Sequence, residues 1–135
     1  MDIEREKKLI ATAAHLLQKD VEYFSELDAM TGDGDHGVTI GRLAEAIAAA
    51  CEETSSDSAL EELFYTIFQK AMDINGGCAG TLWAQMFSGV SEAATDAEQI
   101  TPGLLRTLYQ GALDGLREVS DAKLGEKTML FTIFS

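Results

Sequence analysis

Residues 27–37 read Leu-Asp-Ala-Met-Thr-Gly-Asp-Gly-Asp-His-Gly, and this stretch decides how the chain folds. Glycines at positions 32, 34 and 37 interrupt any regular helix, so the apolar patterns before and after them belong to separate helices. The same glycines let the backbone turn sharply enough to bring Asp28, Asp33 and Asp35 to one centre. Three carboxylates this close repel one another unless they are solvated or hold a cation.

The chemistry of this acidic segment points to a hard divalent cation. Carboxylate oxygens without clustered thiols or imidazoles are ligands for Mg²⁺, Mn²⁺ or Ca²⁺, and Mg²⁺ takes further ligands from water and substrate phosphates. An EF-hand is excluded, because a loop counted from Asp33 places Ala44 where the bidentate glutamate belongs. A solvated turn remains an open alternative, since Gly and Asp are common in turns. His36 alone is ambiguous, but beside an anionic ligand it would donate a hydrogen bond to phosphate.

Outside this segment, apolar residues recur at three-, four- and seven-residue intervals, which predicts amphipathic helices. The first helix should end before Met30, and polar or glycine-bearing turns should separate the others. The expected helices cover residues 3–24, about 38–53, 60–72, about 79–94 and 102–119. The sequence therefore predicts an all-α chain of about five helices in a single domain, 1–135.

Capping residues support two of these helix starts. Ser58 with Glu61 three residues later reads as a capping box at the start of the third helix. Thr101 followed by Pro102 reads as a helix start with proline at the first helical position. Only residues 129–134 are rich in β-formers and form a candidate strand.

Composition excludes several classes of protein. The net charge of −13 repels phosphate backbones, so no nucleic-acid partner is expected, although divalent cations can still bridge carboxylates to a nucleotide. No apolar run approaches the roughly 20 residues that span a bilayer, and residues 1–8 lack a signal core, so we expect no membrane association and a cytoplasmic location. Cys51 and Cys78 are far apart and outside any CxxC pair, which predicts buried free thiols.

Two further glycine segments carry weaker signals. Residues 75–81, Asn-Gly-Gly-Cys-Ala-Gly-Thr, place glycines at the expected start of a helix, where backbone N–H groups suit phosphate. A glycine pair is also the ordinary way to stop a helix, and neither a Walker sequence nor a GxGxxG fingerprint is present. Residues 125–130, Gly-Glu-Lys-Thr-Met-Leu, place a cation and a hydroxyl after a glycine, which alone reads as a surface turn.

Taken together and in this order, the three segments resemble the L subunit of dihydroxyacetone kinase, or the equivalent domain of the single-chain enzyme. That family carries an aspartate, then Gly-Asp-Gly/Ala-Asp-His-Gly, then Gly-Gly-x-Ser-Gly, then Gly-Asp-Lys-Thr-Met. The first motif is matched from Asp28 through Gly37, and His36 favours the dihydroxyacetone type over related fatty-acid kinase domains.

The resemblance implies an antiparallel helical barrel whose loops at one end hold ADP or ATP, with two Mg²⁺ ions. It implies that Asp28, Asp33 and Asp35 are the metal ligands. It also implies nucleotide contacts at the matching positions, which are His36, Gly37, Val38, Thr39, Cys78, Ala79, Ser120 and Met129. Dihydroxyacetone would be held by a separate K subunit, and in phosphotransferase-type systems an M subunit would rephosphorylate the bound ADP.

The sequence departs from the family pattern at several points. Ala79 replaces the usual serine, and Glu126 replaces the usual aspartate. The chain is expected to be the N-terminal part of the family domain, with exposed apolar stripes that favour self-association; a fragment of a longer protein is the alternative. The favoured function is the nucleotide-binding subunit of a kinase for dihydroxyacetone or a related short-chain sugar. A non-catalytic relative that holds Mg-ADP or a regulatory partner, and a plain helical interaction domain, remain alternatives.

Overall fold

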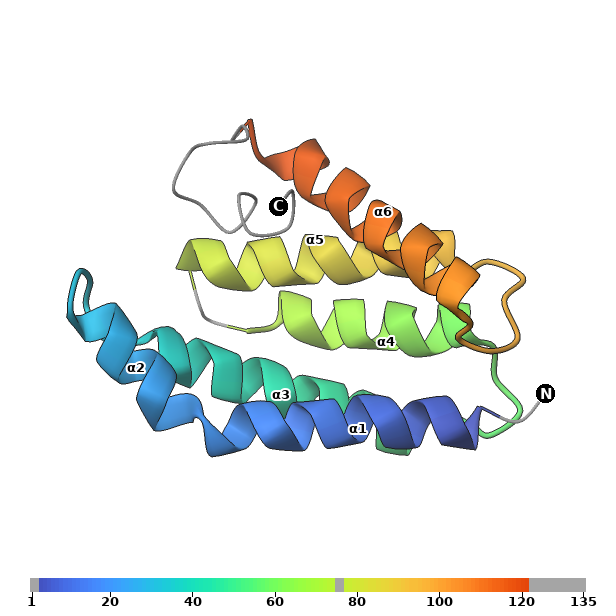
Figure 1. Ribbon diagram of the computed structural model, residues 1–135, viewed down its shortest axis with the longest axis horizontal. Coiled ribbons are helices and arrows are strands. Elements are labelled where there is room, and N and C mark those ends of the chain that lie inside the picture. Colours follow the sequence, from blue (N-terminus) through green and yellow to red (C-terminus); the bar gives the residue numbers. More distant parts are fainter. Residues whose placement is uncertain (1–2, 75–76, 122–135) are drawn as a thin grey trace.

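The computed structural model describes residues 3–74 and 77–121, with the backbone alone described at 77 and 78, and these residues form six α-helices. All-α architecture is therefore confirmed. The helices are α1 (Glu4–Lys19), α2 (Val21–Ala29), α3 (His36–Glu53), α4 (Leu60–Met72), α5 (Gly77–Ala93) and α6 (Pro102–Val119). Helices α1 and α2 run in the same general direction, and from α3 to α6 each helix reverses the direction of the one before it (Figure 1).

The helices pack mainly against their neighbours in the chain. Helix α3 contacts α1 and α2 on one side and α4 on the other, and α5 packs between α4 and α6. Within the described residues, α6 contacts neither α1 nor α2, so the layer of helices is open between its first and last members. The arrangement is antiparallel as expected, but these residues do not close a barrel.

A continuous apolar core fills the space between the helices. Its largest fully buried side chains come from four segments of the chain: Ile3, Leu43, Leu60, Leu63, Ile67 and Leu116. Helix α3 lies between α1 and α4, and its fully buried Ala44 and Ala50 allow both neighbours to approach closely. Burying these aliphatic side chains supplies the main favourable free energy of folding.

Helices α5 and α6 cross with their backbones in direct contact. A Cβ atom on Gly89 would overlap the carbonyl of Gly111, and one on Gly115 would overlap the carbonyl of Gln85. Only glycine permits this approach, which fixes where α6 lies on α5. Gly111 and Gly115 of α6 therefore serve helix packing.

The structure corrects the prediction of a single first helix. The chain leaves the α-helical region at Asp20, whose φ of −102° and ψ of 10° separate α1 from α2. Because the apolar period continues from Leu17 to Val21 and Phe24 and no Gly or Pro marks the break, the sequence pattern runs through it. The described chain thus has six helices rather than about five, although α2 ends before Met30 as predicted.

Other boundaries shift by small amounts. Helix α3 begins at His36 rather than near Val38, and α5 begins at Gly77 rather than near Ala79. The predicted start of α6 is confirmed, since the Thr101 hydroxyl accepts a hydrogen bond from the N–H of Leu104 at 3.1 Å. The candidate strand at residues 129–134 lies outside the described residues.

The predicted capping box at Ser58 is wrong. Ala59 occupies the N-cap position of α4, with extended backbone angles, and no side chain caps the helix. Ser58 is instead buried one residue earlier. Ser58 and Glu61 have the residue types and spacing of a capping box, but the helix begins one residue later than this pattern predicts.

Candidate metal and nucleotide site

The acidic segment joins α2 to α3 at one end of the molecule (Figure 1). Asp28 lies in the last turn of α2, Asp33 lies in the connecting loop, and Asp35 is the N-cap residue of α3. The two helices therefore place one carboxylate on each side of the loop, and the loop itself supplies the third.

Glycine makes this tight connection possible. Gly34 adopts a φ of +77°, a left-handed conformation that other residues rarely take. Gly32 donates its N–H to the carbonyl of Asp28 at 2.6 Å, and a Cβ atom on Gly32 would lie 2.7 Å from Asp28 Oδ1. A side chain at position 32 would therefore push the Asp28 carboxylate out of place.

Gly37 holds the first turn of α3 against α2. A Cβ atom here would overlap the carbonyl oxygen of Val21 and the hydroxyl of Ser25. The resemblance assigns Gly37 to phosphate contact, and the structure shows that its lack of a side chain already serves helix packing. This contact fixes the spacing between Asp28 on α2 and Asp35 on α3.

The three carboxylates converge as the sequence predicted. One oxygen from each of Asp28, Asp33 and Asp35 lies within 4.8 Å of the others, with Asp28 half-buried and the other two exposed. Two oxygens on opposite sides of one ion lie about 4.2 Å apart for Mg²⁺ and about 5 Å apart for Ca²⁺. The cluster therefore fits the ligand shell of one divalent cation with little movement. Exposed acidic groups also cluster without a cation, so geometry alone does not assign the ion.

The carboxylates are also arranged by hydrogen bonds. The Asp28 Oδ2 atom accepts the N–H of His36 at 3.2 Å, which holds this side chain toward the start of α3. A hydrogen bond between the side chains of Asp33 and Asp35 lowers the pKa of Asp33 and raises the pKa of Asp35. The pair therefore shares a proton more readily than two separate carboxylates, and a bound cation would take the place of that proton.

The predicted phosphate contacts at the start of α3 differ in exposure. The Val38 side chain is exposed, Thr39 is buried, and the His36 ring packs edge-on against Phe24 with ring centroids 6.4 Å apart. Since the Thr39 side chain faces the protein interior, a phosphate would meet the backbone of this first turn before that hydroxyl. The positive end of the α3 dipole adds to the attraction for an anion beside the acidic cluster.

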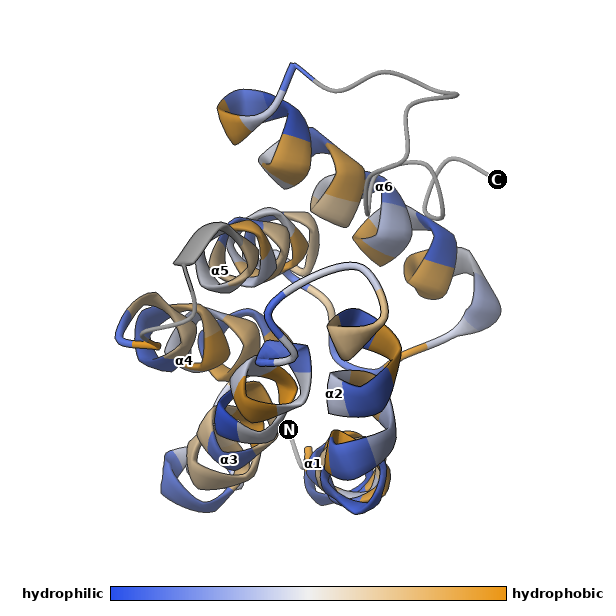
Figure 2. Ribbon diagram, turned by 90° about the vertical axis from the view of Figure 1, so that its left-hand side faces the viewer, coloured by the Kyte–Doolittle hydropathy of each residue, from blue (hydrophilic) through white to orange (hydrophobic). Residues whose placement is uncertain are grey.

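Two further helix ends that carry predicted nucleotide contacts lie near the acidic loop. The N-terminal end of α5 and the C-terminal end of α6 are both at the end that carries the acidic loop (Figure 1). Ala79 is half-buried in the first turn of α5, and Ser120 is the C-cap residue of α6. The side chain of Cys78 and all of Met129 lie outside the described residues. Figure 2 shows the start of α5, the acidic loop and the end of α6 in one view from that end.

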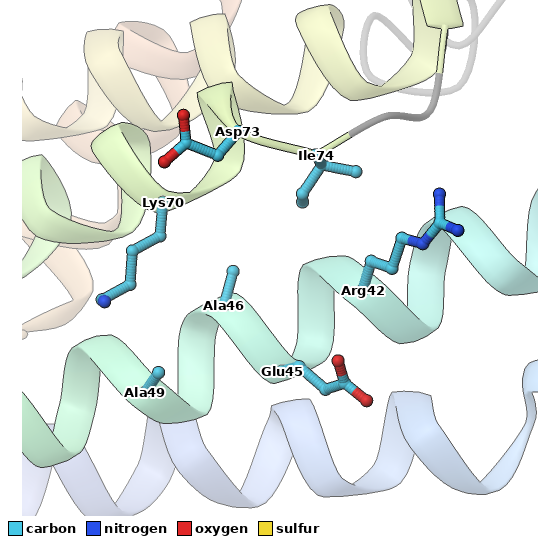
Figure 3. Close-up of a pocket in the computed structure, with 7 residues that line it drawn as sticks. All are labelled: Arg42, Glu45, Ala46, Ala49, Lys70, Asp73 and Ile74. Atoms are coloured by element: carbon cyan, nitrogen blue, oxygen red, sulfur yellow. The ribbon is translucent and has the colours of Figure 1, made fainter.

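A groove between α3 and the end of α4 lies apart from the predicted site residues. It has a volume of about 460 Å³ and is lined by Arg42, Glu45, Ala46, Ala49, Lys70, Asp73 and Ile74. In Figure 3, Arg42 and Ile74 lie across the groove from each other, while Lys70 points toward the C-terminal half of α3, where it pairs with Glu53 at 2.7 Å.

Residues 30–133 match the DAK2 domain family. The chain belongs to that family. The matched segment includes Asp33, Asp35 and all the later glycine segments, and Asp28 lies two residues before it. The family assignment thus confirms the resemblance inferred from the three glycine segments.

Curated relatives of this DAK2 domain are kinases or kinase subunits. The chain is 32% identical over 115 residues to the ADP-binding subunit DhaL of PEP-dependent dihydroxyacetone kinase 1 from Listeria innocua, covering 84% of this chain and 57% of that protein. Identity is also 32% over 115 residues to the ADP-binding subunit DhaL of the PTS-dependent dihydroxyacetone kinase of Lactococcus lactis, covering 84% and 56%. A D-erythrulose kinase from Mycolicibacterium smegmatis is 27% identical over 128 residues, which are 91% of this chain and 22% of that protein. The chain thus spans a little over half the length of the first two relatives.

Two further predictions concern membrane-spanning helices and cysteine burial. None of the helices in the described ranges is both long and apolar enough to cross a membrane. Cys51 is a buried free cysteine, as predicted, and its burial raises the pKa of the thiol.

Proposed function

We propose that this DAK2 domain binds ADP or ATP with Mg²⁺ and serves as the nucleotide-binding part of a kinase for dihydroxyacetone or a related short-chain sugar. The single observation that supports this most strongly is the convergence of Asp28, Asp33 and Asp35 beside the N-terminus of α3. The similarity to two ADP-binding subunits supports ADP as the nucleotide of this site.

The proposed roles follow from position. Asp28, Asp33 and Asp35 would hold Mg²⁺, two ions by the family resemblance, which would neutralise charge on the phosphate oxygens. The first turn of α3, from His36 to Thr39, would lie beside the phosphates, and Cys78, Ala79, Ser120 and Met129 would contact the rest of the nucleotide. No residue of this chain acts as a nucleophile, because phosphoryl transfer depends chiefly on position and charge.

Partners complete the proposed reaction. A K subunit would hold the sugar and present its hydroxyl to the terminal phosphate. Where the donor is of the phosphotransferase type, an M subunit would restore ATP on the domain; otherwise ATP would exchange freely. The sugar-binding and phosphate-supplying steps therefore lie on other proteins.

A second candidate is a domain that retains Mg-ADP without supporting transfer. Ala79 favours it, because the usual serine hydroxyl at this position would donate to phosphate. If the chain already supports phosphoryl transfer, Ala79→Ser should leave nucleotide binding nearly unchanged. If the missing hydroxyl donor limits phosphoryl transfer, the same variant should raise the transfer rate.

The test separates binding from transfer. Calorimetric titration with ADP should show binding that requires Mg²⁺, and no binding in either condition would overturn the proposal. Adding a K subunit with dihydroxyacetone and ATP, or with an M subunit and its phosphate donor, should then yield sugar phosphate. Binding without product would favour the second candidate.

A further inference from the structure

The imidazole ring of His36 rests on an aromatic side chain of α2. The rings of Phe24 and His36 meet at 78°, with their centroids 6.4 Å apart. Aromatic pairs favour this edge-to-face arrangement, because the positive edge of one ring meets the negative face of the other. Both side chains are half-buried, and in residues 3–74 and 77–121 no other aromatic ring is in contact with His36. The contact links the middle of α2 to the first residue of α3.

The backbones that carry the two rings are held at a fixed separation. A Cβ atom on Gly37 would overlap the carbonyl oxygen of Val21, which lies one turn before Phe24 on α2. The N–H of His36 also donates to the Oδ2 atom of Asp28, one turn after Phe24, at 3.2 Å. Contacts on both sides of Phe24 therefore fasten this part of α2 to the start of α3. The position of Phe24 relative to His36 is thus set by backbone packing.

The orientation of the His36 ring needs a restraint of its own, because rotation about the side-chain bonds moves both ring nitrogens even when the backbone is fixed. Within the described ranges, no group forms a hydrogen bond with this ring. The contact with Phe24 is therefore what restricts its rotation there. A side chain that is already restricted loses less conformational entropy when it binds a ligand. Phe24 can thus raise the affinity for a ligand of His36 without touching that ligand.

We propose that Phe24 is a positioning residue of the nucleotide site, where it holds the His36 imidazole in the orientation that donates a hydrogen bond to a phosphate of ADP or ATP. The inference rests on the proposed function, in which His36 lies beside the phosphates. It requires an aromatic ring at position 24 and not apolar bulk alone, since leucine lacks the aromatic face. The sequence reasoning missed Phe24 because the apolar period assigns it to the buried stripe of the first predicted helix.

The first experiment measures ADP affinity in the presence of Mg²⁺ by calorimetric titration. Phe24→Leu should weaken binding by about twofold to tenfold, the range expected for the loss of one aromatic pair. Phe24→Tyr keeps the ring and should bind like the unmodified chain. The matched control is Phe68→Leu on α4, which removes a half-buried ring whose centroid lies 5.7 Å from that of Tyr65. This control should leave the ADP affinity unchanged, and circular dichroism should show the same helix content in all variants.

A double-mutant cycle tests whether Phe24 acts through His36. In a His36→Ala background, Phe24→Leu should cause no further loss of ADP affinity, because the ring that it positions is gone. An equal loss in both backgrounds would show that Phe24 supports the junction of α2 and α3 and not the His36 ring, which would overturn the proposal. Unchanged affinity of Phe24→Leu in the otherwise unmodified chain would overturn it as well.

Nuclear magnetic resonance of the ligand-free chain tests the ring contact itself. The chain has two histidines, His15 and His36, so the His36 ring signals can be assigned by their loss in His36→Ala. These signals should show nuclear Overhauser contacts with the Phe24 ring, and the absence of such contacts would reject the proposal. If the unmodified chain does not bind ADP with Mg²⁺, the proposed function fails and this inference fails with it. Intact binding with equal Phe24→Leu losses in both backgrounds rejects this inference alone.

Discussion

At the scale of single residues, the acidic cluster depends on glycines that leave room for other atoms. Gly32 makes space for the Asp28 carboxylate, and Gly34 turns the chain in a left-handed conformation. Gly37 lets the first turn of α3 lie directly on α2. The arrangement of the three carboxylates thus depends on the missing side chains of these glycines as well as on the aspartates themselves.

Replacing Gly37 with alanine tests this packing. The added Cβ would overlap the Val21 carbonyl, and backbone cannot move aside as a flexible side chain can. We expect Gly37→Ala to lower the free energy of unfolding by about 1–3 kcal/mol, as overpacking does. The control is Gly41→Ala on the same helix, where the new Cβ would lie 3.3 Å from a Val21 methyl group. Urea titration of both variants should show a clearly larger loss at position 37.

The buried thiol of Cys51 gives a second residue-scale prediction. Burial raises the pKa of this thiol, so at a given pH less thiolate is present in the folded protein than in the unfolded chain. In a Cys78→Ala background, Cys51 should react slowly with a thiol reagent at neutral pH and faster as the pH rises or after unfolding in urea. Equal rates in the folded and unfolded chains would show that Cys51 is accessible.

At the scale of elements, the sequence predicted most helices but missed features that tertiary contacts decide. The period that marks the first helix continues through Asp20, so the break between α1 and α2 has no local signal. The capping box at Ser58 has the right residues, yet Ala59 takes the cap position. The aspartate cluster was predictable because glycine spacing sets it locally. The burial of Thr39 was not, because it depends on how α3 packs against other helices.

The cap of α6 is the element-scale feature that both sequence and structure support. Thr101→Ala removes the hydroxyl that accepts the Leu104 N–H, which should cost about 1 kcal/mol of stability. Thr107→Ala on the same helix is the control, because Thr107 is exposed and alanine favours helix. Thermal unfolding should show a lower midpoint for the first variant only. Equal midpoints would mean that the cap contributes little.

At the scale of the whole molecule, 23 acidic and 10 basic residues leave a net charge of −13. Such a chain attracts cations in general, so a specific metal site must be distinguished from nonspecific attraction. The site proposed here differs from the rest of the surface because three carboxylates meet at one helix start. Its cation should therefore stabilise the folded chain more than equal ionic strength does.

Thermal stability in the presence of Mg²⁺ tests this distinction. A ligand that binds only the folded state raises the unfolding midpoint in proportion to the logarithm of its concentration above the dissociation constant. We expect MgCl₂ to raise the midpoint by more than NaCl at matched ionic strength, and ADP to add to the effect only when Mg²⁺ is present. The same shift with both salts would indicate screening of repulsion alone.

The most direct test of the central claim is ADP titration of Asp33→Asn beside the unmodified chain, with and without Mg²⁺. Asn keeps the size of Asp33 but removes its charge, and this exposed position should leave the helices intact. Asp57→Asn, an exposed aspartate outside the cluster, serves as the matched control. The account predicts that Mg²⁺-dependent binding falls by about tenfold or more for Asp33→Asn, which is about 1.4 kcal/mol, and is unchanged for Asp57→Asn. Equal affinity of Asp33→Asn and the unmodified chain, at unchanged helix content, would contradict the assignment of this cluster as the metal and nucleotide site.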